Sequence, residues 1–513
     1  MTNRFVPSRT VLTAIASAAL LAACGGGGSD DTPPVSGTNP QVCSPNNPYR
    51  ADAGGRYVNG TWTTVSYTNG SISTEKSWLQ SYMTDAYLWY SQMPSVNASL
   101  SQYSNDTPAG FYPSIDGYFE ALKTPARTAT GALLDRFSFT YPTKLWADLI
   151  GSGTSGGYGI EWSVTYDDPT RTETRHIKVA YVEVGSAVAA LGITRGDEVL
   201  QIDGVAANVT TEAGRQVLNA GLSPDIGANH TFVIARNGVT LAPLTLTGAS
   251  ITADPVPNTH VDVVNGKRIG YILFNSHTAA SEAKLIASVN SLAGQGIDDL
   301  VLDVRYNGGG YLYVASELAY MIAGSARTAG KTFEKLQYND KRTADNNRAP
   351  TEFFSTSNSG ATLPSLNLGR VTVLTTGNTC SASEAIINSL RGVGVTVTVV
   401  GGTTCGKPYG FTAKDNCGIS YFPIEFKGVN NVGFGDYADG FAPNCAVADD
   451  LSQPLGSRQE LQYATAVGQL LNGSCSPVFA RAEPRGGVPN VGGRILRGPE
   501  RENRILLEEG RVR

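Results

Sequence analysis

A serine and a lysine, 26 residues apart, have the residue types and surroundings of a nucleophile and its base. Ser381 lies between a run typical of a buried strand (371–374) and a run typical of a helix (385–390). A serine at such a turn exposes its hydroxyl near the positive end of a helix. Lys407 follows a second strand-like run (395–400). We predict that Ser381 is a nucleophile and Lys407 its base. A helix cap beside a surface lysine is the alternative that these residues alone leave open.

The elements around this pair predict a parallel α/β fold that would bring the two side chains to one edge. Strand-like and helical runs alternate along the chain: 268–274, 279–292, 300–304 and 313–322. Such a βαβ series favours parallel pairing, and active groups gather at the C-terminal ends of its strands. Ser381 and a triple glycine (308–310) both fall there.

The triple glycine has neither the GxxxxGK[ST] nor the GxGxxG spacing, so nucleotide binding is not expected. Glycine lets the backbone turn its N–H groups toward a small target, which suits an oxyanion hole as well as a plain tight turn.

Composition limits the class of protein. The chain has 513 residues, which suggests three or four domains, and 41% of them are hydrophobic. A formal net charge of −5 argues against nucleic acid as the main partner. The four histidines are scattered, and no CxxC motif is present, so we expect neither a metal nor a cofactor and interpret the histidines as structural or surface residues.

The N-terminus has the pattern of an export signal. Arg4 and Arg9 precede an apolar run (11–21) that is too short to span a bilayer as a mature helix. The run ends in Leu-Ala-Ala-Cys24 and is followed by four glycines, which resembles a bacterial lipobox with Cys24 as the lipidated residue. An ordinary secretory signal is the alternative. We predict a lipoprotein signal peptide (1–23) and a flexible linker (24–47).

Glycine rather than aspartate follows Cys24, which, by resemblance to enterobacterial sorting, favours the outer membrane. The predicted location is therefore the periplasmic side of the cell envelope, with the membrane contacted through a lipid anchor. If Cys24 is lipidated, six cysteines remain, and an even number in an exported protein predicts disulfide bonds. Of the 15 possible pairings we favour Cys405–Cys417, because the segments between them have the pattern of a hairpin.

The remaining chain divides by pattern. Trp78, Tyr82, Ala86 and Trp89 have helical spacing after a start at 73–75, and Met93-Pro94 is the predicted helix end. Four further regions follow from composition and periodicity: a mainly helical domain (48–148), a β-rich domain (155–250), an α/β domain (251–475) and a tail predicted to be disordered (476–513).

The β-rich region resembles a bacterial PDZ domain in the run from Ser186 to Gly204, where a short helix, a glycine turn, a strand and an Asp-Gly turn follow each other. In such domains the C-terminus of a peptide is added as a strand, and backbone N–H groups hold its carboxylate. The resemblance implies that the loop at Tyr158, Gly159 and Ile160 has this role.

The order of domains and motifs along the chain resembles that of the C-terminal processing peptidases, also called tail-specific proteases. It consists of a helical domain, a PDZ domain, Asp-x-Arg-x-Asn-x-Gly-Gly at 303–310, Ser-Ala-Ser-Glu at 381–384 and Gly-Lys at 406–407, and it covers about 73–470. The resemblance implies a crotonase-like α/β serine peptidase domain with Ser381 and Lys407 as its catalytic dyad. It further implies an oxyanion hole from the N–H groups of Ala382 and Gly309. Glu384 either orients the lysine or only begins the helix.

The chain departs from the family pattern near the lysine. Many members have glutamine four residues after it as a third catalytic partner, where this chain has Phe411. Cys380, Cys405 and Pro408 also replace more usual residues, and a disulfide at Cys380 could fix the nucleophile loop.

The resulting hypothesis is a lipid-anchored serine endopeptidase that selects proteins with free C-termini. A catalytically silent PDZ scaffold and a hydrolase of small esters or amides are the alternatives. The substrate and the oligomeric state do not follow from the sequence.

Overall fold

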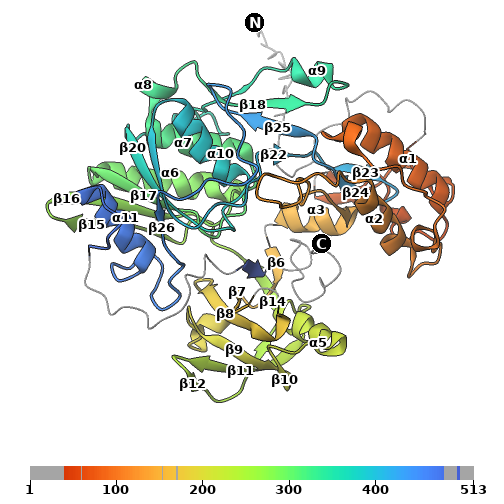
Figure 1. The fold of residues 1–513 in the computed structure, drawn as a ribbon, viewed down its shortest axis with the longest axis horizontal. Coiled ribbons are helices and arrows are strands. Elements are labelled where there is room, and N and C mark those ends of the chain that lie inside the picture. Colours follow the sequence, from red (N-terminus) through yellow and green to blue (C-terminus); the bar gives the residue numbers. More distant parts are fainter. Residues whose placement is uncertain (1–39, 59, 153, 169–170, 479–493, 497–513) are drawn as a thin grey trace, which may run out of the picture.

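The computed structural model describes residues 40–478 and 494–496, except 59, 153 and 169–170, and Figure 1 shows their arrangement. The signal peptide, Cys24 and most of the predicted linker and tail therefore lie outside the described residues.

A six-stranded sheet forms the centre of the α/β domain. Its order is β15-β16-β17-β20-β21-β26, with bounds Asn258–Val264, Lys267–Leu273, Asp299–Asp303, Arg370–Thr375, Thr396–Gly401 and Cys445–Ala446. The strands from β16 to β26 pair in parallel, and β15 pairs antiparallel with β16. The parallel pairing predicted from the βαβ pattern is confirmed for β16, β17, β20 and β21.

Helices cover both faces of this sheet, which explains the continuous apolar runs of its strands. One face packs against α6 (Ala279–Gly294), α7 (Leu312–Ala323) and α10 (Ala382–Gly392), and the other against α11 (Leu461–Asn472). The shared edge where β17 and β20 end carries 308–310 and Ser381.

A smaller antiparallel sheet lies beside α7 and α10, and its strand order is β19-β18-β25-β22. The bounds are Thr351–Glu352, Thr332–Tyr338, Phe426–Val429 and Tyr409–Gly410. Glu334 on β18 thus comes close to the segment that begins at Lys407, although 73 residues separate them in the sequence. The sequence patterns gave no indication of this sheet.

The N-terminal helical region contains α1 (Ile72–Ala86), α2 (Phe111–Leu122) and α3 (Thr143–Ser152). The α1 helix begins after Ser71, whose hydroxyl accepts a hydrogen bond from the Thr74 N–H. It ends at Ala86, so the predicted end at Met93-Pro94 is wrong. Tyr87 turns to an extended conformation and is fully buried, and Trp89 packs edge-to-face on Tyr409. Tertiary packing of these aromatic rings therefore overrides the helical spacing.

Part of the α/β chain completes the core of this region. The strands β23 (Lys414–Asn416) and β24 (Ile419–Phe422) form a three-stranded sheet with β5 (Phe139–Pro142). Phe411, Tyr421 and Phe422 are buried among the aromatic residues of α1 and α2. The predicted boundary at 148 therefore does not separate two independent cores.

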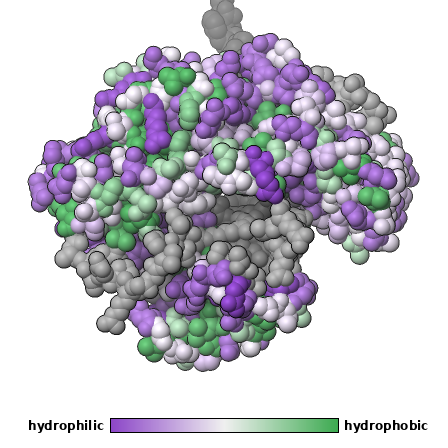
Figure 2. Space-filling model, viewed as in Figure 1, coloured by the Kyte–Doolittle hydropathy of each residue, from purple (hydrophilic) through white to green (hydrophobic). Residues whose placement is uncertain are grey.

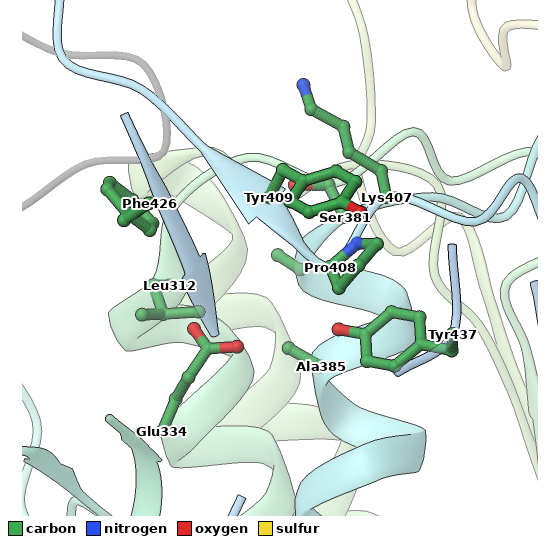
Figure 3. Close-up of a pocket in the computed structure, with 10 residues that line it drawn as sticks. Leu312, Glu334, Ser381, Ala385, Lys407, Pro408, Tyr409, Phe426 and Tyr437 are labelled. Atoms are coloured by element: carbon green, nitrogen blue, oxygen red, sulfur yellow. The ribbon is translucent and has the colours of Figure 1, made fainter. Parts of the chain in front are cut away.

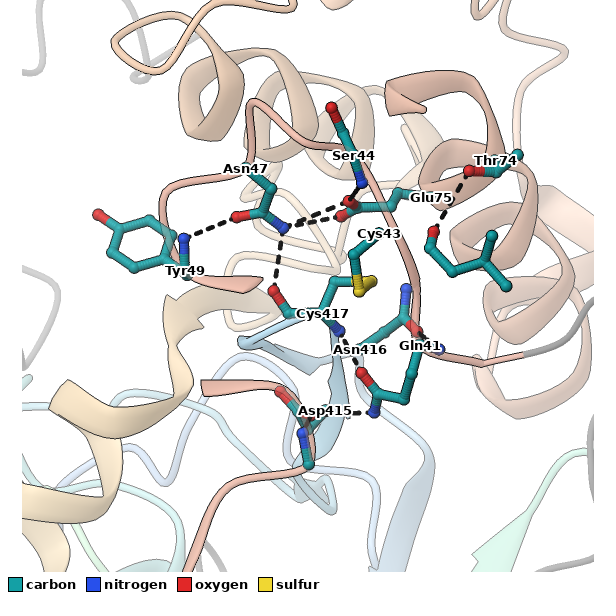
Figure 4. The surroundings of a disulfide bond; sticks show 12 residues. Gln41, Cys43, Ser44, Asn47, Tyr49, Thr74, Glu75, Asp415, Asn416 and Cys417 are labelled. Atoms are coloured by element: carbon teal, nitrogen blue, oxygen red, sulfur yellow. Dashed lines mark hydrogen bonds between the residues drawn. A yellow bond between two sulfur atoms is a disulfide. The ribbon is translucent and has the colours of Figure 1, made fainter. Parts of the chain in front are cut away.

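The last part of the predicted linker is structured rather than flexible (Figure 4). The β1 strand (Val42–Cys43) pairs with β4 (Thr68–Asn69), and Cys43 forms a disulfide with Cys417. Asn47 is buried and donates hydrogen bonds to both carboxylate oxygens of Glu75. Burial raises the pKa of Glu75 to about 8.

The β-rich region forms a separate β-domain (154–252), at the bottom of Figure 1. Its main sheet has the order β12-β11-β9-β8-β7, and α5 (Glu212–Leu222) packs against it. Those strands are Val239–Thr240, Asn229–Arg236, Glu198–Ile202, Arg175–Val182 and Ile160–Tyr166; β10 (Val205–Ala206) and β13 (Leu244–Thr247) pair at its rim, and β6 (Thr154–Gly157) pairs with β14 (Ala249–Thr252).

Three residues of the predicted disordered tail form a strand. The β27 strand (Arg494–Leu496) pairs antiparallel with β7. The prediction of a disordered tail is therefore wrong for these three residues. Ile495 is 1% exposed, and its N–H donates to Asn378 Oδ1 at 3.0 Å. Burial of an apolar side chain and three backbone pairs explain why this short segment is held.

The other elements are short and lie in connections: η1 (Arg50–Asp52), β2 (Arg56–Val58), β3 (Thr61–Thr63), η2 (Tyr90–Gln92), η3 (Ser101–Tyr103), η4 (Thr172–Thr174), α4 (Ala187–Ala190), α8 (Ser325–Thr328) and α9 (Thr343–Asn346). Of the helices in the described residues, none combines the length and apolar character that a membrane span requires.

Candidate active site

Ser381 lies at a strained turn between β20 and α10. Its φ is +55° and its ψ −116°, a conformation that costs a residue with a side chain on the order of 1–3 kcal/mol. The residue is 9% exposed and directly precedes the first helical residue, Ala382. The strand-to-helix turn predicted from the sequence is therefore present, and it places the hydroxyl near the positive end of α10.

The carboxylate of Glu384 connects the nucleophile turn to the lysine segment. One oxygen accepts from Ser381 N at 3.0 Å and Lys407 N at 2.8 Å, and the other from Gly406 N at 2.8 Å and Thr404 Oγ1 at 2.5 Å. Burial raises the pKa of Glu384, and these hydrogen bonds oppose that shift. Glu384 therefore begins the helix and also holds the backbone of Lys407.

A disulfide makes a second connection between the same two segments. Cys380 precedes Ser381 and is bonded to Cys405, with their Cα atoms 5.2 Å apart. The predicted Cys405–Cys417 bond is wrong, because Cys417 pairs with Cys43 and Cys445 with Cys475. The expectation that a disulfide at Cys380 could fix the nucleophile loop agrees with this pairing.

We expect the Cys380→Ser/Cys405→Ser variant to lose hydrolytic activity roughly 10-fold or more, because a displaced nucleophile costs rate steeply. The loss of the cross-link should also lower the free energy of unfolding by about 3 kcal/mol. Denaturant unfolding and initial rates measure the two effects. The matched control is Cys445→Ser/Cys475→Ser, whose disulfide spans a similar 30 residues. Equal activity losses in both variants would mean that the Cys380–Cys405 bond has only a general stabilising role.

Lys407 lies in the same pocket as Ser381 but presents its amino group elsewhere. Its Nζ is 4.3 Å from the ring centroid of Phe411 and 5.4 Å from that of Phe137. Figure 3 shows the lysine amine pointing away from Ser381. The aromatic residue at the position of the usual glutamine thus contacts the lysine through its ring face. A rotation of the lysine side chain is needed to bring the amine to the serine.

The predicted oxyanion donors lie next to each other, but one of them is engaged. A Cβ on Gly309 would stand 2.8 Å from Ser381 Cβ and 3.0 Å from Ala382 N, so only glycine permits this approach. The Gly309 N–H, however, donates to Asn307 Oδ1 at 3.0 Å. In this conformation the predicted donor Gly309 is therefore directed at a side chain rather than at the pocket.

A buried histidine that the sequence interpretation left as structural or surface lies behind this turn. His277 is 1% exposed, and its Nδ1 is 2.9 Å from the same Asn307 Oδ1, so this nitrogen is the donor. Burial lowers the pKa of His277 to about 4, which keeps the ring neutral. Its position four residues after the end of β16, at the edge where Ser381 lies, was a signal that could have identified it.

The predicted carboxylate-binding loop lies at the start of β7, in the β-domain. Gly159 has φ +77°, and its carbonyl accepts from Glu183 N at 2.7 Å. Tyr158 is buried against Phe232, and its hydroxyl has no hydrogen-bond partner among the described residues. This loop is thus on a different domain from Ser381 and Lys407.

Charged side chains connect the β-domain to the chain beside the turn at 308–310. Arg195 Nη2 of the β-domain is 2.6 Å from Asp449 Oδ1, and its Nη1 donates to Tyr306 Oη at 2.5 Å. Arg305 is fully buried and forms ion pairs with Asp449 and with Asp303. The segment 303–307 therefore contacts Asp449, which binds Arg195 of the β-domain, and it also leads directly into Gly309.

Sequence comparisons agree with the class of protein that this fold and site define. Residues 268–414 match the sequence model of peptidase family S41, and residues 74–139 match that of the peptidase S41 N-terminal domain. A carboxyl-terminal-processing protease of Picosynechococcus sp. is 30% identical over 169 residues, 33% of this chain and 38% of that protein. A chloroplastic C-terminal processing peptidase of Tetradesmus obliquus is 28% identical over 213 residues, 38% of this chain and 43% of that protein.

Two segments of the chain therefore match peptidase S41 family domains, and the chain is similar to carboxyl-terminal-processing proteases. The match spans less than half the length of either of these two relatives. A solved S41 protease structure from Bacteroides fragilis matches 77% of this chain and 97% of that chain, with a TM-score of 0.58 and 24% identity, which shows a shared fold.

Proposed function

We propose that the protein is a lipid-anchored serine endopeptidase of the cell envelope that cleaves proteins selected by their C-termini. The observation that supports the peptidase assignment is that Glu384 accepts hydrogen bonds from the backbone N–H groups of both Ser381 and Lys407 and so holds their two segments together. The S41 domains support the reaction class. The lipid anchor rests on the Leu-Ala-Ala-Cys24 segment.

In the proposed reaction Lys407, unprotonated, takes the hydroxyl proton of Ser381 as the oxygen attacks a peptide carbonyl carbon. The protonated lysine then gives this proton to the leaving amine, and an ester of Ser381 remains. Water then attacks the ester carbonyl carbon while Lys407 takes a proton from it; the bond to Ser381 Oγ breaks, Lys407 returns the proton to this oxygen, and the acid product is released. The N–H of Ala382 and an N–H of 308–310 would hold the oxyanion.

The resting conformation needs two adjustments before this reaction can occur. The amine of Lys407 must leave the Phe411 ring for Ser381, and the Gly309 N–H must leave Asn307 if it is to bind the oxyanion. Hydrogen bonds of a catalytic site often form fully only in the substrate complex. Because 303–307 lies between Arg195 and Gly309, we propose that substrate on the β-domain favours both adjustments.

Substrate capture is proposed to occur at the edge of β7 that faces away from β8, next to Tyr158, Gly159 and Ile160, in the manner of a PDZ domain. The chain's own β27 pairs with this edge: Arg494 lies opposite Val164 and Leu496 opposite Trp162. From Arg494 to Leu496 the strand runs toward Ile160, and the C-terminus of a bound peptide would run in the same direction. We therefore expect β27 to compete with the substrate C-terminus.

A chain that ends at residue 493 should bind a peptide with a free C-terminus several-fold more tightly than the full chain, because an occupied edge reduces apparent affinity. The Ser381→Ala background prevents cleavage, and fluorescence anisotropy measures the affinity. A chain that ends at 496 keeps β27 and is the matched control. Equal affinities of the two truncated chains would contradict the competition.

A catalytically silent binding protein is the second candidate, and the contact of Lys407 with Phe411 favours it. Three substances separate the candidates: an unstructured protein, a short ester and a fluorophosphonate probe. A peptidase cleaves the protein and is labelled at Ser381, which peptide mapping detects. A small-molecule hydrolase is labelled but prefers the ester. If the protein is not cleaved and Ser381 is not labelled, the peptidase assignment is overturned in favour of the binding protein.

A further inference from the structure

A pocket opens beside Ser381, and both apolar and polar side chains line it (Figure 3). The pocket is narrow: its inner part has room for about one water molecule, and the 230 Å³ of empty space around the lining residues includes open solvent at its mouth. Ser381, Ala382 and Ala385 form one wall along the first turn of α10. The remaining lining residues are Leu312, Glu334, Lys407, Pro408, Tyr409, Phe426 and Tyr437. A pocket that begins at the nucleophile is where the side chain next to the attacked carbonyl would lie.

One carboxyl group lies in this pocket without a partner among the described residues. Glu334 of β18 is 6% exposed, and no hydrogen bond or ion pair to its side chain occurs among the residues that the structure describes. Figure 3 shows its carboxyl group directed into the space between Leu312 and Ala385. A Cβ on Gly428 of β25 would stand 2.0 Å from Glu334 Oε1, so the neighbouring strand leaves room for the carboxyl group only because this residue is glycine.

The position is unfavourable for an isolated carboxylate. Burial alone raises the pKa of Glu334 to about 8, and no neighbouring charge contributes to the shift. A buried polar group without a partner costs free energy that a bound partner would recover. A cation brought by a ligand would both ionise Glu334 and satisfy it.

We propose that this pocket, once its lining side chains rotate to widen it, binds a lysine or arginine side chain of the substrate residue whose carbonyl carbon Ser381 attacks, with Glu334 as its counter-charge. The proposal rests on the proposed peptidase function of Ser381. The methylene stem would contact Leu312, Ala385 and Phe426, and the cationic tip would meet Glu334.

The other titratable groups of the pocket are compatible with this assignment. Lys407, Tyr409 and Tyr437 line it, and Glu334 is its only carboxylic acid. The amine of Lys407 points away from Ser381 and lies over Phe411, so it does not occupy the space in front of Glu334. A short neutral side chain would leave the carboxyl group unsatisfied, which disfavours alanine or serine at this substrate position.

Matched peptides that differ only at the residue before the cleaved bond test the proposal. We expect kcat/KM for lysine or arginine to exceed that for methionine or alanine by at least about 10-fold, the range of one charge-assisted contact. Glu334→Gln should remove this preference and leave the alanine peptide within about threefold of wild type. The lysine-to-alanine ratio should rise between pH 6 and pH 9, because Glu334 must be ionised. Cleavage of both peptides depends on the same proposed base, Lys407, so the titration of that base cancels in the lysine-to-alanine ratio of kcat/KM.

Two controls keep the outcome decisive. Glu317→Gln removes another buried carboxyl group whose pKa burial raises to about 8, on α7, and should leave the preference unchanged. Binding of the same peptides to Ser381→Ala, with and without Glu334→Gln, gives a readout that needs no catalysis. If no peptide is cleaved, the peptidase assignment fails, while the binding preference still decides the role of Glu334. Equal binding and equal cleavage of lysine and alanine peptides would overturn the proposal.

Discussion

Replacing Ser381 by alanine, or Lys407 by methionine, is expected to lower the hydrolysis of an unstructured protein by about 10⁴-fold or more. In the proposed reaction the serine supplies the attacking oxygen, and without it no ester intermediate would form. Methionine retains a chain of similar length that can still pack on Phe411, so Lys407→Met removes the amine with little change in packing. Initial rates of cleavage, followed by mass spectrometry of the fragments, measure both effects.

The two variants should also show the non-additivity of groups that act together. The double variant is expected to be about as inactive as either single variant, because each alone already removes the activated nucleophile. Lys427→Met is the matched control: this lysine of β25 pairs with Asp436 at the surface, and its loss should change the rate less than about twofold. A Lys407→Met protein that keeps more than a tenth of the wild-type rate would show that another group acts as base.

Local sequence signals were sufficient for the elements that position Ser381 and Lys407. The apolar runs of β16, β17, β20 and β21 are continuous because helices cover both faces of the sheet, and the turn at Ser381 follows such a run directly. Parallel pairing then brings the C-terminal ends of β17 and β20 together, so the proximity of 308–310 and Ser381 could be predicted.

The remaining features depend on contacts between distant parts of the chain. Glu334 reaches the pocket because β18 pairs with β25, and nothing in the pattern of either strand specifies the other. The Cys43–Cys417 bond joins residues 374 positions apart, and six cysteines allow 15 pairings that spacing cannot distinguish. Trp89 continues the helical spacing of α1, yet its contact with Tyr409 lies outside the helix.

Sequence could also not indicate how Lys407 is held. The missing glutamine at position 411 predicted only that the usual partner is absent. The arrangement has two parts: the aromatic face of Phe411 contacts the side chain, and Glu384 binds the backbone N–H. The second part follows from the burial of Glu384 between two segments that are adjacent only after folding.

The Glu384→Gln substitution should therefore have a large effect although it preserves shape. Each carboxylate oxygen accepts two hydrogen bonds, one pair from Ser381 N and Lys407 N and the other from Gly406 N and Thr404 Oγ1. A glutamine has one oxygen, so its amide nitrogen must face donors at one of the two positions. Two buried donors then lose their acceptor, which should lower the free energy of unfolding by roughly 3 kcal/mol.

The same change should reduce kcat about 100-fold, because the backbones of nucleophile and base are no longer held together, with a smaller change in KM. Denaturant unfolding and steady-state kinetics separate the two effects, and Glu317→Gln, which removes a buried carboxyl group outside this contact, should retain the wild-type kcat. Destabilisation with an unchanged kcat would limit Glu384 to beginning α10. A reduced kcat at a temperature where the variant is fully folded would identify it as the residue that positions Lys407 relative to Ser381.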